Sequence, residues 1–213
     1  MAINLTTLTA RQIMMDAAVI PVIVLHDVRH AVPLARALVA GGIRMLEVTL
    51  RTPAALACME AIAGEVEGVV LGAGTVCNAE QAKAAYKAGA RFAVSPGLTQ
   101  NLAAACADLA LPLLPGVATG SEIMAAADMG FQALKFFPAV QAGGAAMLKA
   151  WGGPFTETVF CPTGGITPDN AKEFLSLPNV VCVGGSWLTP QSLIDRGDWA
   201  SITELAQAAT RLR

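Results

Sequence analysis

Short apolar runs recur along the chain, and each is followed by a polar or glycine-rich corner and then by an alanine- and leucine-rich stretch. Eight such runs cover residues 19–25, 43–50, 69–75, 91–97, 111–117, 132–138, 158–165 and 180–187. Strands that alternate with helical stretches predict βαβ units and a parallel sheet. A parallel sheet covered by helices on both faces also explains why the runs are so continuously apolar.

The eight units favour a closed (β/α)8 TIM barrel, because they repeat at a spacing of about 20 to 25 residues. Gly42, Gly89 and Gly130 each end a predicted helix just before the next strand, where a left-handed glycine commonly closes the last turn. A doubly wound open sheet is the alternative. It is less favoured because no G-x-G-x-x-G sequence follows residues 19–25.

The ends of the chain add one helix each to this plan. An extra N-terminal helix, roughly Thr7–Ala17, is expected to cap the bottom of the barrel, and residues 199–213 predict a final amphipathic helix. No linker interrupts the pattern, so residues 1–213 are expected to form a single domain. Four polar residues are expected to be helix N-caps: Asn78, Thr99, Ser121 and Thr167.

Composition and charge narrow the possible partners. Hydrophobic residues make up 54% of the chain, charged residues make up 14%, and the formal net charge is -2. A large core with little charge excludes a disordered chain. Lysines and arginines are scattered, so neither nucleic acid nor a membrane surface is an expected partner. No signal peptide or membrane-spanning run is predicted either.

The cysteines and histidines give no sign of a metal site. The five cysteines form no C-x-x-C pair, and the two histidines, His26 and His30, lie in a predicted turn. We expect reduced thiols in a cytoplasmic protein, and a surface or capping role for the histidines. No metal and no cofactor are expected.

The second run ends in polar residues. Glu47, Thr49 and Arg51 alternate with apolar neighbours and share a face with Ile43 and Met45. Catalytic residues of such barrels come from the carboxyl ends of the strands, and buried polar groups are costly unless they have partners. An ion pair between Glu47 and Arg51 that merely plugs the barrel mouth is the alternative.

The sixth run, "QALKFFP", places a lysine among bulky apolar residues. Alternation turns Lys135 inward together with Ala133, while Leu134 and Phe136 face the helices. Burial favours the neutral amine, which can form a Schiff base with a carbonyl substrate. A salt bridge to Glu47 without catalysis is the alternative.

The remaining strand ends predict a ligand site with a phosphate. "GAGT" ends the third run with glycines that leave room for a ligand and with the hydroxyl of Thr75. Pro96 forms a tight corner at the end of the fourth run. Glycine pairs end the seventh and eighth runs, where barrels commonly bind phosphate through backbone N–H groups. The residues expected to bind it are Gly164, Gly165, Gly184, Gly185 and Ser186.

Seven segments together resemble one known family. They are "EVTLRTP", "GAGTV", "FAVSPG", "LPGVAT", "LKFFPA", "PTGGI" and "VGGSWL". The chain is similar over essentially its whole length to the class I 2-keto-3-deoxy-6-phosphogluconate aldolases, also called 4-hydroxy-2-oxoglutarate aldolases, of the Entner–Doudoroff pathway. The resemblance implies a metal-independent (β/α)8 lyase, typically a homotrimer, that forms pyruvate and glyceraldehyde 3-phosphate from a phosphorylated keto acid.

The resemblance also implies roles for individual residues. Lys135 would form the Schiff base and Glu47 would act as acid and base. Arg51 would bind the pyruvate carboxylate and Thr75 would contact the same end of the substrate. The residues expected to complete the substrate site are Pro96, Phe137 and Thr163.

Three other functions remain open at this point. The first is the 6-phosphogalactonate aldolase, which differs in C4 stereochemistry and would use the same catalytic residues. The second is a phosphate-binding barrel isomerase or decarboxylase that uses Lys135 only as a charge. The third is a barrel that binds a sugar phosphate without turnover, which the inward set of Glu47, Arg51 and Lys135 makes the weakest of the three.

Overall fold

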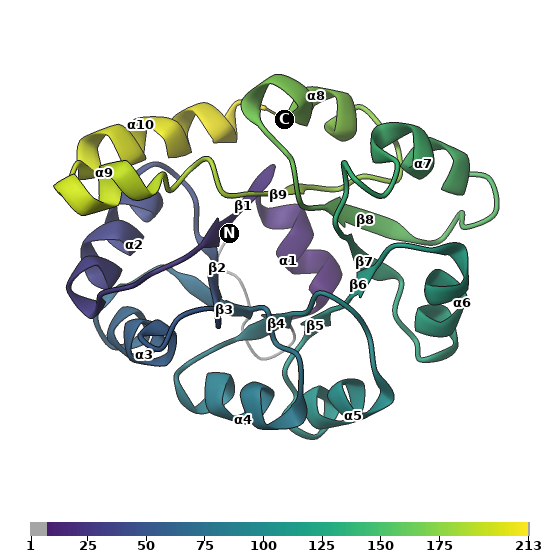
Figure 1. Cartoon of the computed structure of the whole chain (residues 1–213), viewed down its shortest axis with the longest axis horizontal. Helices are drawn as coiled ribbons and strands as arrows, with labels where there is room; N and C mark the ends of the chain where they lie inside the picture. Colours follow the sequence, from purple (N-terminus) through teal and green to yellow (C-terminus); the bar gives the residue numbers. More distant parts are fainter. Residues whose placement is uncertain (1–7, 213) are drawn as a thin grey trace.

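The computed structural model describes residues 8–212, and its strands form one closed ring surrounded by helices (Figure 1). The strands are β1 Val19–Ile23, β2 Met45–Thr49, β3 Val70–Gly74, β4 Phe92–Val94, β5 Leu113–Leu114, β6 Gly116–Val117, β7 Ala133–Phe136, β8 Val159–Pro162 and β9 Val183–Gly185. The pairings between these strands are all parallel. The TIM-barrel prediction is confirmed.

The ring closes through two weaker connections. Six strands pair in the order β5-β4-β3-β2-β1-β9, and three pair in the order β6-β7-β8. Two isolated parallel bridges, Phe160 with Val180 and Thr163 with Gly184, join β8 to β9. The other connection between the two sheets is continuous backbone. β5 and β6 are the two halves of the fifth predicted strand, which is divided at Pro115.

Pro115 explains this division. Proline has no backbone N–H and cannot donate to a ladder, so the strand changes partner at that residue. Leu114 pairs with Val94 of β4 on one side, and Gly116 pairs with Lys135 of β7 on the other. The carbonyl of Pro115 still accepts a hydrogen bond from the Lys135 N–H at 2.8 Å. The bend therefore leaves Lys135 anchored in the sheet.

The amino-terminal end of the barrel is closed by α1 (Ala10–Asp16), which lies across the middle of the ring in Figure 1. The expected N-terminal helix is therefore present, although Thr7 lies outside the described residues. Ile13 and Met14 of α1 are buried against side chains that point into the barrel. This inner cluster comprises Leu8, Ile13, Met14, Ile20, Met45, Val70, Phe92, Val94, Leu114, Ala133, Val159, Cys161 and Cys182.

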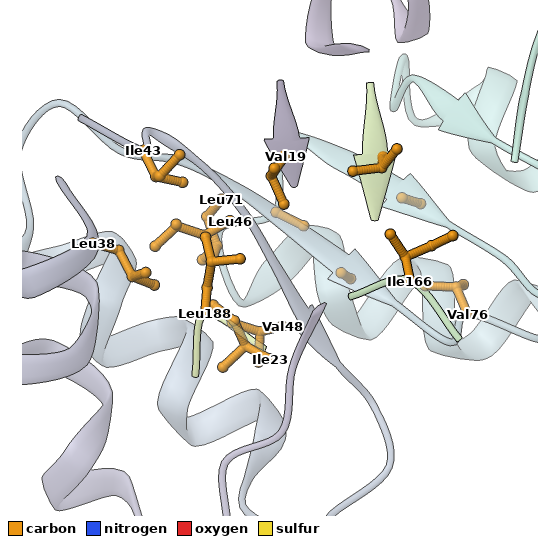
Figure 2. Packing of buried hydrophobic residues seen from close by; sticks show 14 of the residues in the cluster. Val19, Ile23, Leu38, Ile43, Leu46, Val48, Leu71, Val76, Ile166 and Leu188 are labelled. Carbon is orange, nitrogen blue, oxygen red and sulfur yellow. The ribbon is translucent and has the colours of Figure 1, made fainter. Parts of the chain in front are cut away.

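A second, outer cluster fills the layer between strands and helices. It contains the other face of each strand, including Leu46, Val48, Leu134 and Phe136. Figure 2 shows part of it, with Leu38 of a helix beside the strand residues Leu46 and Leu71. Alternation within β2 and β7 is thus as predicted. Ile43 is the exception: it lies before β2 begins and belongs to the outer cluster.

The helices that cover the ring are α2 Ala31–Ala40, α3 Ala55–Glu65, α4 Ala79–Lys87, α5 Gln100–Asp108, α6 Gly120–Asp128, α7 Gly144–Trp151, α8 Pro168–Leu175, α9 Gln191–Arg196 and α10 Trp199–Thr210, with a short 3-10 helix at Val28–His30. The predicted tail helix corresponds to α10. The separate helix α9 was missed, since its six residues are too few to show a helical period.

The predicted N-caps are right at Asn78 and Thr99, whose side chains accept hydrogen bonds from Gln81 N–H and Leu102 N–H. Ser121 is wrong. Thr119 caps α6 instead, and its partner Glu122 completes a capping box. A glutamate at that position satisfies the N-cap N–H, which fixes the helix start two residues earlier.

Four of the five cysteines are buried, as expected of small core residues, and Cys77 is exposed. Burial raises the pKa of the Cys106 thiol from 9.0 to about 11, and it also raises the pKa of Cys58. Within residues 8–212, no helix is both long and apolar enough to cross a membrane.

The helix-to-strand junctions share a backbone conformation that one residue fits poorly. Gly42, Gly89 and Gly130 have φ values of 93°, 95° and 86°, which confirms the left-handed helix stop. The equivalent position after α5 is Ala110, with a φ of 49°. A side chain in this region costs about 1–2 kcal/mol.

We therefore expect Ala110→Gly to stabilise the protein by about 0.5–1 kcal/mol, after the greater flexibility of glycine in the unfolded chain is subtracted. Urea denaturation measures the change. Ala104→Gly is the matched control, because Ala104 is an exposed residue inside α5. It should lose about 1 kcal/mol. Equal losses in both variants would contradict the assignment of strain to Ala110.

Candidate active site

A buried ion pair lies in the interior of the barrel near the carboxyl ends of its strands. Lys135 Nζ is 3.3 Å from Glu47 Oε1, and only 7% and 4% of the two side chains are exposed. The two residues come from β7 and β2, which occupy opposite sides of the ring. Lys135 thus has the inward orientation expected from alternation, and the salt bridge considered as an alternative is present.

The carboxylate of Glu47 occupies space that a glycine leaves open. A Cβ atom added to Gly74 of β3 would collide with Glu47 Oε1 and would lie 2.6 Å from its Cγ. Gly72 similarly leaves room for the ring of Phe92. The glycines of "GAGT" were expected to make space for a ligand. That interpretation is wrong for their side-chain positions, which neighbouring side chains fill.

Arg51 does not pair with Glu47. Among residues 8–212, no ion pair involves Arg51, and its side chain is exposed. The alternation that was expected to carry it inward ends with β2 at Thr49, since Arg51 lies in the following turn. The alternative of a Glu47–Arg51 ion pair that plugs the barrel mouth is therefore wrong, and the guanidinium is available to an anionic ligand.

Thr75 follows β3 directly and has an unusual backbone. Its φ is 57°, a left-handed value that is a genuine outlier for a β-branched residue. Such conformations cost about 1–3 kcal/mol and cluster at functional sites. Thr75 is half-buried at the carboxyl end of β3.

Phe137 and Pro96 also lie at strand ends. Lys135 Nζ is 5.3 Å from the centre of the Phe137 ring, a cation–π distance. Pro96 is exposed after β4, and its carbonyl leaves no room for a Cβ atom on Gly116 of the next strand. The two residues were both expected at the substrate site, and the structure brings Phe137 into contact with the buried pair.

The two glycine pairs lie side by side, as the phosphate prediction requires. Thr163 and Gly184 form a bridge between β8 and β9. Gly164 and Gly165 have φ values of 101° and 75°, which only glycine adopts easily. Ser186 is exposed just beyond β9.

Gly184 and Gly185 have an additional structural reason to be glycine. A Cβ atom on Gly184 would collide with Thr163 Oγ1, and one on Gly185 would collide with the ring of Trp187. Thr163 is itself buried, with its side chain on the same face of the strand as Cys161 of the inner cluster. Thr163 therefore points into the barrel, one layer above Cys161.

A sizeable cavity lies elsewhere. It measures about 560 Å³ and is lined by α1, the end of α5 and the starts of β5 and β7, including Leu8, Cys106, Leu111 and Phe131. None of the candidate site residues lines it. Since barrel enzymes place their chemistry at the carboxyl ends of the strands, we assign the site to the ion pair rather than to this cavity.

Comparisons with known proteins agree with this geometry. A family model described as "KDPG and KHG aldolase" matches residues 10–205. A 2-dehydro-3-deoxy-phosphogluconate aldolase of Pseudoalteromonas atlantica is 53% identical over 94% of each chain. A KHG/KDPG aldolase of Escherichia coli is 49% identical over the same shares.

A solved structure is similar over nearly the whole chain. It is the KDPG aldolase from Legionella pneumophila with pyruvate captured as a covalent carbinolamine intermediate. It is 48% identical and has a TM-score of 0.93. The match covers 95% of this chain and 98% of that chain. Fold, buried lysine and sequence similarity agree, and the chain belongs to the KDPG and KHG aldolase family.

Proposed function

We propose that this protein is a class I aldehyde-lyase that cleaves 2-keto-3-deoxy-6-phosphogluconate to pyruvate and glyceraldehyde 3-phosphate, and that it also cleaves 4-hydroxy-2-oxoglutarate to pyruvate and glyoxylate. The observation that carries the proposal is the buried contact of 3.3 Å between Lys135 Nζ and Glu47 Oε1. It supports the proposal because an amine and a carboxylate at this distance could act as nucleophile and proton carrier on the same substrate.

Lys135 would start the reaction. Its neutral amine attacks C2 of the keto acid to give a carbinolamine, which loses water to form an iminium ion. The C3–C4 bond then breaks, and its electron pair moves through C3 and C2 to the iminium nitrogen. This leaves an enamine on Lys135 and releases the aldehyde.

Glu47 would carry the protons. Its carboxylate removes the proton of the C4 hydroxyl, through a water molecule, and later returns a proton to C3 of the enamine. Water then hydrolyses the imine, which frees pyruvate and regenerates the amine. The apolar inner cluster beneath the pair and the ring of Phe137 beside it limit competing reactions with solvent.

The remaining residues would bind the two ends of the substrate. Arg51 can hold the C1 carboxylate with two parallel hydrogen bonds, and Thr75 contacts the same end. Pro96 and Thr163 line the middle of the site. The phosphate would bind at the paired glycine corners, through Gly164, Gly165, Gly184, Gly185 and Ser186. The proposal is supported by the bridge between Thr163 and Gly184, which brings the two corners together.

We expect Lys135→Met to abolish aldol cleavage, because methionine cannot form the imine. The variant leaves Glu47 buried without its partner, which costs about 3–5 kcal/mol, so circular dichroism should accompany the assay. In the native protein, borohydride with pyruvate should attach reduced pyruvate to the peptide that contains Lys135. Substantial turnover by a folded Lys135→Met variant, or no label on that peptide, would refute the Schiff-base route.

The gluconate-derived substrate is proposed over the galactonate-derived one because the relatives at 49–53% identity carry the gluconate name. The two substrates differ only at C4, so both could bind the same residues. We expect a higher kcat/KM for the gluconate-derived phosphate in steady-state kinetics with both compounds. A reversed order would assign the protein to the galactonate activity instead.

We expect Gly74→Ala to lower kcat strongly while pyruvate still reacts with Lys135. The added methyl group would collide with Glu47 Oε1, so the carboxylate must turn away from the substrate while the lysine keeps its position. Cleavage should fall by about 10²–10⁴-fold, the usual share of general acid–base catalysis.

The measurement is single-turnover cleavage beside borohydride trapping of pyruvate. Gly64→Ala controls for the loss of a glycine, because nothing lies within 4 Å of an added Cβ atom there and Gly64 is an ordinary helical residue of α3. Full cleavage by Gly74→Ala would show that Glu47 tolerates displacement and is not the proton carrier.

A homotrimer stays a prediction of the sequence resemblance, and a cytoplasmic location stays a prediction from the unpaired cysteines. The mass of the protein in solution, compared with the chain mass of 21.9 kDa, tests the first.

A further inference from the structure

The turn that carries Arg51 is tied to β1 by two threonine hydroxyl groups. Thr49 Oγ1 donates to the carbonyl of Ile23 at 2.8 Å, and Thr52 Oγ1 donates to the carbonyl of Leu25 at 2.5 Å. Both carbonyls lie at the carboxyl end of β1 or just beyond it. The two threonines flank Leu50 and Arg51, so the turn is held at both of its ends.

The turn is also tied to the strand on the other side. Leu50 N–H donates to the carbonyl of Gly74 at 2.8 Å, at the end of β3. Thr52 in addition accepts a hydrogen bond from Ala55 N–H at 3.2 Å, which joins the turn to the start of α3. The backbone on either side of Arg51 is therefore fixed to both neighbouring strands and to the following helix.

The Arg51 side chain has no such ties. It is exposed and makes no ion pair with any of residues 8–212. A fixed backbone with an unoccupied guanidinium is the arrangement that makes binding of a planar carboxylate efficient, because less freedom is lost when the ligand arrives.

We infer that Thr52, together with Thr49, is a positioning residue that holds Arg51 at the place of the substrate carboxylate. The inference rests on the proposed function, in which Arg51 binds that carboxylate. Thr52 is the better residue to test, since it is only half-buried, whereas Thr49 is fully buried within β2.

The test uses Thr52→Val, which keeps the shape of the side chain and removes the hydroxyl group. The readouts are the pyruvate concentration that gives half-maximal borohydride trapping on Lys135 and the rate of trapping at saturation. We expect the half-saturation concentration to rise about three- to tenfold, as for loss of one hydrogen bond. The rate at saturation should be unchanged, and Thr52→Ser should restore the native value.

Thr203→Val is the matched control for stability. Thr203 is also half-buried, and its hydroxyl also donates to a backbone carbonyl of another element, that of Ala37, at 3.0 Å. It lies on α10, outside the barrel. The Thr203→Val variant should have a lowered melting temperature, as Thr52→Val should, but an unchanged half-saturation concentration of pyruvate.

Arg51→Ala separates the two proposals. If Arg51→Ala weakens pyruvate binding and Thr52→Val does not, the positioning role is refuted and the proposed function stands. If Arg51→Ala leaves pyruvate binding unchanged, the carboxylate role in the proposed function fails and the positioning role fails with it. The positioning role is also refuted if Thr52→Ser does not restore the half-saturation concentration that Thr52→Val raises. It is refuted as well if Thr203→Val raises that concentration equally.

Discussion

The contact between Lys135 and Glu47 is the constraint on which the site depends. Two charged groups that are almost completely buried carry a desolvation cost that their attraction must offset, and either one alone would be strongly destabilising. They come from opposite strands of the ring, so only a closed barrel brings them together. The chemistry is therefore inseparable from barrel closure, although closure itself relies on a proline bend and two isolated bridges.

The two ends of the barrel interior differ in polarity. At the amino-terminal end, α1 and the inner cluster form an apolar plug. At the carboxyl end, inward-facing positions are polar instead. They are occupied by Glu47, Lys135 and Thr163, each two residues after an inward apolar residue. Alternation makes this possible, because Met45, Ala133 and Cys161 of the lower layer are each followed two positions later by one of these polar residues. A rigid lower layer then fixes the polar layer without extra contacts.

Sequence periodicity predicted what depends on local geometry. Within a strand, period two placed Lys135 and Glu47 correctly, and glycine marked three helix ends. It failed where the regular element stops: Ile43 precedes β2, Arg51 follows it, and Pro115 divides the fifth strand. It also failed for contacts between distant segments. The reason for Gly74 is a side chain on β2, and nothing in the sequence around Gly74 reveals that neighbour.

Under the proposed function, the fixed residues and the exposed residues of the site would serve different steps. Lys135 is held by its ladder partners and by Glu47, and Thr75 is held in a backbone conformation that threonine disfavours, so the reacting end of the substrate would meet a prearranged surface. Ser186 and Arg51, by contrast, are exposed at the rim. Rim groups can capture an anionic substrate while it is still solvated. Under the proposed function, the buried pair would act only after the substrate carbonyl has entered. Charged groups at the rim and an apolar centre are therefore compatible in one small barrel.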